Sequence, residues 1–153
     1  MALTGKVETE VEVHSPAAKF FNFFITQLHD LHNNTDVIHG AKLHQGDWHS
    51  IGSDSIKQWT YTVDGKVQTC KEHIEEIDHE KKSITFNLFD GDIGEQYKSL
   101  KEKLQVIDEG DGTALAKWTY EYEKLHEGIP SPEPYLDLIT KVTTDVDARL
   151  TKA

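Results

Sequence analysis

A long amphipathic segment near the end of the chain constrains the fold more than any other feature. Over residues 134–150 the apolar residues recur at steps of three and four, which predicts one helix. At 1.5 Å per residue this helix is about 25 Å long. Charged residues interrupt it too often for a membrane span. Its apolar stripe must therefore be buried against another part of the protein, and this stripe includes Leu138, Ile139 and Val142.

Most of the preceding chain predicts β-strands. Residues 5–13 alternate between small or apolar and charged side chains, which is typical of a strand with one buried face. Asp64-Gly65 favours a two-residue hairpin turn. Turns also separate the other strands, which we expect near residues 37–45, 54–63, 66–78, 84–88, 95–107 and 113–123.

One or two short helices are predicted over residues 16–33. Ser15 is expected to cap the first of them, with Pro16 at the first helical position. The order of elements is therefore a strand, short helices, six strands and a long helix. This order predicts a single α+β domain over residues 1–153, with helices on one face of an antiparallel sheet.

The charge balance argues against several classes of partner. The chain has 16 Lys and Arg residues against 27 Asp and Glu residues, which gives a net charge of -11. This charge repels nucleic acids and anionic membrane surfaces. A single cysteine excludes an internal disulfide, and the N-terminus carries no apolar signal sequence. We expect a soluble cytoplasmic protein with no nucleic-acid partner and no stable membrane insertion.

The residues with catalytic chemistry form no recognised motif. The nine histidines lack metal-site spacing, and the 46–52 loop has no phosphate-binding motif, so no metal or cofactor is expected. Cys70 has no partner that would activate its thiol. A further group of carboxylates is interpreted as a solvated face, and it comprises Glu72, Glu75, Glu76, Asp78 and Glu80.

Five aromatic residues share the strand face that is predicted to meet the long helix. They are Trp59, Tyr61, Trp118, Tyr120 and Tyr122. Such side chains fill a core or form the wall of a pocket, and the pattern alone is compatible with both. Buried tyrosine hydroxyls and indole N–H groups need hydrogen-bond partners, which a bound ligand or water supplies in a pocket.

Several segments resemble the major latex protein group of the plant birch-pollen-allergen superfamily (pathogenesis-related class 10). The resemblance extends over the whole chain and is carried by Gly-Asp-Trp-His at 46–49, Ser-Ile-Lys-Gln-Trp at 55–59, Lys-Glu-His-Ile-Glu-Glu-Ile-Asp at 71–78, Gly-Asp at 91–92 and Lys-Trp-Thr-Tyr-Glu-Tyr at 117–122.

This resemblance implies a helix-grip fold. In that fold a seven-stranded antiparallel sheet wraps around a long C-terminal helix, two short helices form a V, and a large apolar cavity lies between sheet and helix. It also implies binding of amphipathic small molecules, such as lipids, sterols, hormones or flavonoid-like metabolites, and a link with plant defence and stress responses. The allergen branch has a glycine-rich loop near which ribonuclease activity has been proposed. Here that loop has only Gly46 and Gly52.

The leading hypothesis is a non-catalytic carrier or sensor of a hydrophobic or amphipathic ligand. Tyrosine hydroxyls and His73 are expected to orient its polar end, and a phosphate head group would need a nearby lysine such as Lys71 or Lys98. A cavity enzyme with Lys71 as its lysine, a ribonuclease, and a ligand-dependent signalling partner are the alternatives. The expected ligand-binding residues are Phe20, Phe24, Trp59, Tyr61, His73, Ile84, Phe86, Leu88, Leu104, Trp118, Tyr120, Leu138, Ile139 and Val142.

Overall fold

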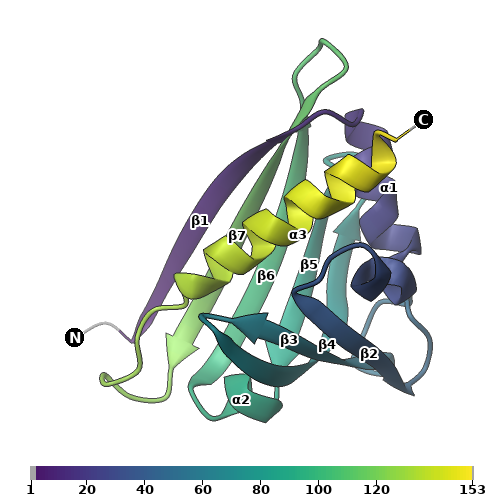
Figure 1. Ribbon diagram of the computed structural model, residues 1–153. Helices are drawn as coiled ribbons and strands as arrows, with labels where there is room; N and C mark the ends of the chain where they lie inside the picture. Colours follow the sequence, from purple (N-terminus) through teal and green to yellow (C-terminus); the bar gives the residue numbers. More distant parts are fainter. Residues whose placement is uncertain (1–2, 153) are drawn as a thin grey trace.

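Seven strands form one curved antiparallel sheet around a long helix in the computed structural model, which describes residues 3–152 (Figure 1). The ends of the expected 1–153 domain, residues 1, 2 and 153, lie outside this part. The elements in chain order are β1 (Thr4–Val13), α1 (Ala17–Thr26), the 3-10 helix η1 (Leu28–Asn33), β2 (Ile38–Gln45), β3 (Ile56–Val63), β4 (Lys66–Asp78), β5 (Ser83–Phe89), α2 (Gly91–Gly94), β6 (Tyr97–Asp108), β7 (Ala114–Lys124) and α3 (Pro134–Leu150).

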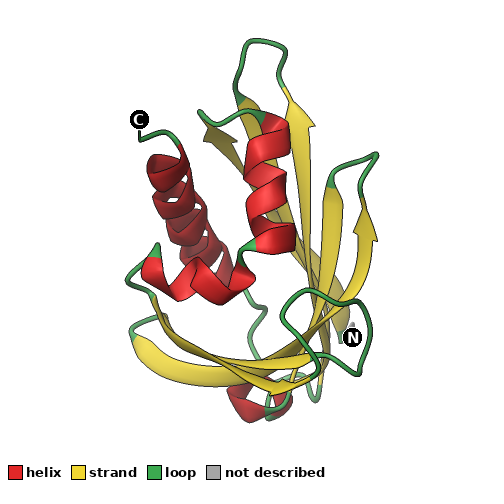
Figure 2. Cartoon of the chain, turned by 90° about the vertical axis from the view of Figure 1, so that its right-hand side faces the viewer, coloured by secondary structure: helices red, strands yellow, loops and turns green. Residues whose placement is uncertain are grey.

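The strand order is β1-β7-β6-β5-β4-β3-β2, and every neighbouring pair is antiparallel. The two edge strands, β1 and β2, are joined by α1 and η1, which meet at a steep angle beside α3 (Figure 2). This arrangement confirms the helix-grip fold, including the seven strands and the two short helices. The short helix α2 was expected to be only a turn.

Local sequence signals explain the main hairpin. Asp64 and Gly65, which join β3 to β4, both have positive φ angles, 53° and 74°. A type I′ turn needs this conformation at both central residues, and Asp-Gly supplies it at low cost. The turn fixes the β3–β4 register, so Trp59 pairs with Cys70 and Tyr61 with Gln68.

The start of α1 differs from the prediction. Ser15 makes no cap hydrogen bond to the helix, which begins at Ala17. Its hydroxyl instead donates to Asp147 Oδ1 of α3 over 2.6 Å, and its backbone N–H donates to the same oxygen over 2.9 Å. A long-range partner therefore replaces the local cap, because α3 brings a buried carboxylate to this point.

The long helix lies across the concave face of the sheet (Figure 1). Its buried face is not wholly apolar, because Thr143 and Asp147 lie on it with Ile139, Val142 and Val146. The Trp118 indole N–H donates to Thr143 Oγ1 over 2.9 Å. Within residues 3–152, no helix has the length and hydropathy needed to cross a membrane.

Candidate functional site

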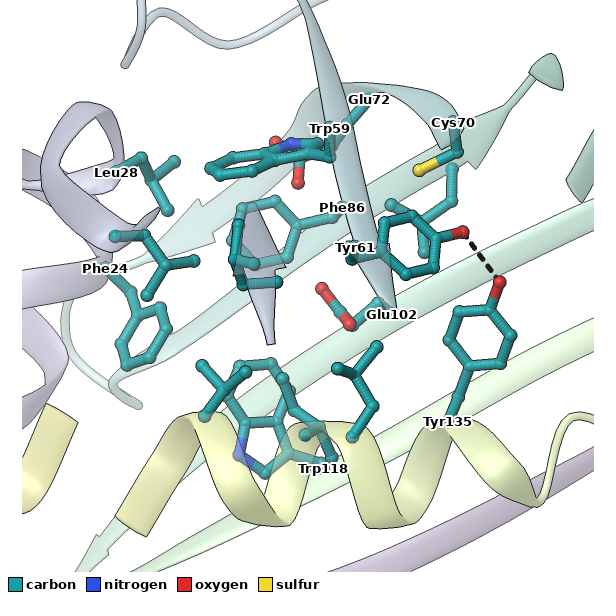
Figure 3. Close-up of a pocket in the computed structure, with 16 residues that line it drawn as sticks. Phe24, Leu28, Trp59, Tyr61, Cys70, Glu72, Phe86, Glu102, Trp118 and Tyr135 are labelled. Carbon is teal, nitrogen blue, oxygen red and sulfur yellow. Dashed lines mark hydrogen bonds between the residues drawn. The ribbon is translucent and has the colours of Figure 1, made fainter. Parts of the chain in front are cut away.

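A cavity of about 70 Å³ lies between the sheet, the short helices and α3 (Figure 3). Its wall is mainly apolar and aromatic. The lining residues come from all of these elements and are Phe24, Leu28, Leu31, Ile38, Trp59, Tyr61, Cys70, Glu72, Phe86, Leu88, Glu102, Trp118, Tyr135, Leu138, Ile139 and Val142. The predicted pairing of the long helix with the aromatic strand face thus encloses space as well as a packed core.

Most of the predicted ligand-binding residues lie on this wall. The nine that line it are Phe24, Trp59, Tyr61, Phe86, Leu88, Trp118, Leu138, Ile139 and Val142. Four others are buried in the core without lining the cavity, namely Phe20, Ile84, Leu104 and Tyr120. Residues that line the cavity and residues that pack in the core share the same inward faces of the strands. Strand parity alone therefore does not distinguish cavity-lining residues from core residues.

His73 does not face the cavity, contrary to the sequence prediction. The inward residues of β4 are Cys70, Glu72 and Ile74, so alternation places His73 on the outer face. Its ring lies 5.7 Å from the ring of Phe89, measured between centroids. The role expected for His73, orienting a ligand's polar end inside the cavity, is therefore wrong for this geometry.

The two candidate lysines are also outside the cavity. Lys71 lies on the outer face of β4, and its Nζ is 3.4 Å from Asp90 Oδ2. Lys98 is exposed on β6, and its Nζ is 3.7 Å from Glu123 Oε2. Neither ammonium group is positioned to meet a phosphate or to act as a catalytic amine in the cavity.

The mouth of the cavity lies where η1 and β2 approach α3. The lining side chains in its depth are almost fully buried, for example Phe24, with 2% of its surface exposed. Leu31 and Ile38 keep 8% and 9%, and Leu138 is only partly buried. Leu138 is the most exposed apolar residue of the wall, so we assign the mouth to this side of the cavity.

Two tyrosines form a polar contact at one end of the cavity. The hydroxyls of Tyr61 and Tyr135 lie 2.7 Å apart (Figure 3). The Tyr135 hydroxyl also donates to Gln68 Oε1 over 3.3 Å. Burial raises the pKa of both phenols. They therefore remain neutral and are available as donors and acceptors.

Glu102 is a partly buried acid on the cavity wall that sequence reasoning missed. Its carboxyl points into the cavity from β6 (Figure 3), and its Oε2 accepts a hydrogen bond of 2.5 Å from the Tyr120 hydroxyl. Burial raises the pKa of Glu102 to about 8, the Tyr120 hydrogen bond opposes this rise, and the Glu72 charge adds to it.

Glu72 is more deeply buried, which corrects the sequence prediction that it belongs to a solvated face. Only 4% of its surface is exposed, and its Oε2 lies 3.5 Å from the Nζ of the fully buried Lys57. Burial raises the pKa of Glu72 to about 7, although Lys57 opposes the rise. The Lys57 ammonium also donates to the Trp48 carbonyl over 3.1 Å, which holds the 46–52 loop against the sheet.

Strand parity contained a signal for all three missed residues. Each of them lies two positions from an inward-facing residue and so shares its face of the strand. Lys57 shares the inward face with Trp59, Glu72 with Cys70, and Glu102 with Leu100 and Leu104. Charged residues in a strand are normally assigned to the solvent-exposed face. This general preference leads to a wrong assignment for the few charged residues that face the interior.

Hydrogen bonds within the 46–52 loop and to η1 hold this loop in place. Asp47 accepts hydrogen bonds from the backbone N–H groups of His49 and Ser50. His49 Nε2 in turn accepts from the Leu28 N–H over 3.1 Å, which joins the loop to η1. Within residues 3–152, no group of three or more His, Cys, Asp or Glu side chains is arranged to hold a metal ion.

The cavity is smaller than the resemblance implies. One water molecule needs roughly 10–15 Å³ on this measure, so about 70 Å³ holds only a few waters. Large side chains occupy the rest of the space between sheet and helix, among them Trp59, Phe86, Trp118 and Tyr135. A larger ligand needs these side chains or the mouth to move.

The whole sequence matches one protein family. The family model described as pathogenesis-related protein Bet v 1 family matches residues 2–153. MLP-like protein 43 from Arabidopsis thaliana is 40% identical over 151 residues, which are 97% of this chain and 94% of the relative. The resemblance to major latex proteins is thus confirmed.

Solved structures agree with this assignment. The crystal structure of ginseng major latex-like protein 151 from Panax ginseng matches with a TM-score of 0.91 and 35% identity, covering 99% of this chain and 100% of that one. The solution structure of a major latex protein family member from Arabidopsis thaliana matches with a TM-score of 0.67 and 34% identity, covering 97% and 94%. The chain belongs to the pathogenesis-related protein Bet v 1 family.

Proposed function

We propose that this protein binds an amphipathic hydrophobic small molecule, without catalysis, in the cavity between the sheet and α3. The observation that carries the proposal is the mainly apolar cavity wall, interrupted by a few convergent polar groups. Apolar burial supplies affinity at roughly 25 cal/mol per Å². The Tyr61–Tyr135 pair and Glu102 supply orientation for a polar end.

Binding of a lipid, a sterol, a hormone or a secondary metabolite requires the cavity to enlarge. Specific ligand pockets have volumes of about 300–1,000 Å³, whereas this cavity has about 70 Å³. The side chains of Leu31, Ile38 and Leu138 line the mouth and are the first to move in our proposal. We further propose that this carrier or sensor acts in the cytoplasm, and that it takes part in plant defence or stress responses, as the family resemblance implies.

The enzymatic alternatives receive less support from the geometry. Lys57 is buried in an ion pair behind the wall, and Lys71 lies on the outer face, so neither presents a free amine to a substrate in the cavity. A ribonuclease needs cationic groups that hold the phosphate backbone, which the net charge of -11 disfavours.

A binding assay tests the proposal directly. We expect saturable binding of the neutral dye Nile red at one site per chain, measured by its fluorescence, and displacement by a competing apolar ligand. Native mass spectrometry of protein purified from its source identifies the natural occupant. Absence of saturable binding for any apolar dye would overturn the proposal.

A pair of tryptophan substitutions locates the binding site. Leu138→Trp adds bulk at the mouth and is expected to weaken Nile red binding. Leu125→Trp makes the same change at a residue that is 48% exposed and does not line the cavity, so binding should be unchanged. Equal effects of the two substitutions would place the dye elsewhere.

A further inference from the structure

The charged groups around the cavity do not balance. Two carboxyls line the wall, Glu72 and Glu102, and their oxygens lie among the lining side chains in Figure 3. One ammonium group, Lys57, lies 3.5 Å from Glu72 and is fully buried behind it. Among residues 3–152, no lysine, arginine or histidine lines the cavity itself. The charges therefore balance only while Glu102 keeps its proton, and with both acids ionised the site is one positive charge short.

The hydrogen bonds around these acids are also incomplete. Glu72 is 4% exposed, and its Oε2 accepts no hydrogen bond, with the Lys57 ammonium 3.5 Å away as its ion-pair partner. The indole Nε1 of Trp59, which is 5% exposed, lies near this carboxyl without a well-aligned hydrogen bond. Glu102 receives one hydrogen bond, on Oε2, from Tyr120. A carboxylate has about four acceptor sites, so both acids have room for a further donor from the cavity.

On the basis of the proposed binding function, we propose that the cavity takes amphipathic ligands whose polar end is a protonated amine. An ammonium group beside Glu102 supplies the missing positive charge and donates to carboxyl oxygens. Charge-assisted hydrogen bonds of this kind are roughly twice as strong as hydrogen bonds between neutral groups. The apolar remainder of the ligand lies against Phe86, Trp118 and Ile139.

The same geometry disfavours anionic ligands. A carboxylate or phosphate at this position meets two acids and no free cation, because Lys57 is engaged by Glu72 and by the Trp48 carbonyl. Like charges in a desolvated site repel strongly, so a bound anion prevents Glu102 from ionising, whereas a bound ammonium group pairs with its ionised form. A neutral alcohol avoids this repulsion and gains no ion pair, so we expect its affinity to lie between those of the amine and the anion.

Three octyl compounds that differ only in the head group test the proposal. Binding of n-octylamine, 1-octanol and octanoate is measured by titration calorimetry at pH 7 and physiological salt, with Nile red as an independent probe of the cavity. We expect octylamine to bind tightest and octanoate weakest, with at least a tenfold difference between the two dissociation constants.

The outcomes separate this inference from the proposed function. If octanol binds, and octanoate binds as tightly as octylamine or more tightly, the amine preference is overturned. The proposed carrier function stands in that case. No binding of Nile red or of any octyl compound overturns both.

Two matched substitutions show which carboxyl is responsible. Glu102→Gln keeps the shape of the side chain and is expected to weaken octylamine binding about tenfold while changing octanol binding less than about twofold. Glu121→Gln removes an exposed acid from the outer face of β7 and should change neither affinity. Retained octanol binding also shows that the Glu102 variant is folded.

An equal loss of octylamine affinity in both variants would mean that the amine binds the acidic surface, and it would overturn the assignment to Glu102.

Discussion

Asp147, in the last turns of α3, binds Ser15 through two hydrogen bonds to one carboxyl oxygen. Its other oxygen accepts from the backbone N–H of His14 over 2.9 Å. The carboxylate thus accepts hydrogen bonds from the backbone N–H groups of His14 and Ser15 and from the Ser15 hydroxyl, between the end of β1 and the start of α1. Residues more than 130 positions apart are joined here, which fixes the end of α3 against the sheet and α1.

We predict that Asp147→Ala lowers the free energy of unfolding by about 3 kcal/mol. The substitution leaves two backbone N–H groups and one hydroxyl near the core without an acceptor, and each buried unsatisfied group costs roughly 1–3 kcal/mol. Urea unfolding followed by circular dichroism measures the loss. Asp137→Ala, at an exposed position of the same helix, should cost less than about 1 kcal/mol. Similar losses in both variants would contradict the role assigned to Asp147.

The buried ion pair between Lys57 and Glu72 makes a second prediction. Lys57→Met leaves Glu72 without its counter-charge, and breaking such a pair from one side typically costs about 3–5 kcal/mol. The double variant Lys57→Met with Glu72→Leu should recover much of this loss, because no buried charge remains. Thermal unfolding of the two single variants and the double variant closes the cycle. A double variant less stable than Lys57→Met alone would show that the pair itself is not the cause.

The acids of the cavity predict an unusual pH dependence. The pKa of Glu102 is raised from 4.5 to about 8 and that of Glu72 to about 7, so the folded protein holds protons that the unfolded chain releases. Their stabilising contribution is complete below pH 4.5 and is lost as pH rises to about 8.

We therefore expect Glu102→Gln to remove part of the fall in stability between pH 5 and pH 9, measured by chemical unfolding at each pH. The groups that face Glu102 are Glu72 and Cys70 of β4, Tyr120 of β7 and Tyr135 of α3, with Lys57 behind Glu72. These remain in the variant, so the difference between the two pH profiles isolates Glu102. Profiles that run parallel across this range would contradict the raised pKa.

Filling the cavity should separate binding from folding. Val142 is 1% exposed and lines the cavity from α3. We expect Val142→Trp to abolish Nile red binding and to cost about 1–3 kcal/mol of stability through overpacking. Dye titration and urea unfolding on one preparation give both values. Wild-type dye affinity in a folded variant would place the ligand elsewhere, and an unfolded variant would mean that the space was already full.

Strand parity predicted the fold and most of the cavity wall. The Asp-Gly turn at 64–65, the clean alternation in β1 and the aromatic face of β7 each specify local structure through backbone geometry and side-chain burial. They placed Trp59, Tyr61 and Trp118 opposite the helix that carries Leu138, Ile139 and Val142. The family resemblance added the way in which sheet and helix close on each other.

The remaining features depend on long-range contacts. In β4 no clear apolar alternation marks the inner face, and Val67, the apolar residue with the same strand parity as Lys71 and His73, is 66% exposed. His73 and Lys71 were therefore placed on the wrong side. Glu72 and Glu102 were missed because a buried acid is tolerated only when partners such as Lys57 and Tyr120 come from other strands. Those partners are defined by the sheet register.

The helix α3 is attached at both ends, by the Tyr61–Tyr135 contact near its start and by Asp147 near its end. Movement of the whole helix away from the sheet would break the hydrogen bonds at both of these ends. Backbone movement for ligand entry is therefore assigned to the η1–β2 side of the mouth, with only side chains such as Leu138 moving on α3. There β2 is an edge strand with a single neighbour and two irregularities in its pairing with β3. Amide hydrogen exchange should accordingly slow on ligand binding in η1 and β2, while α3 stays protected throughout.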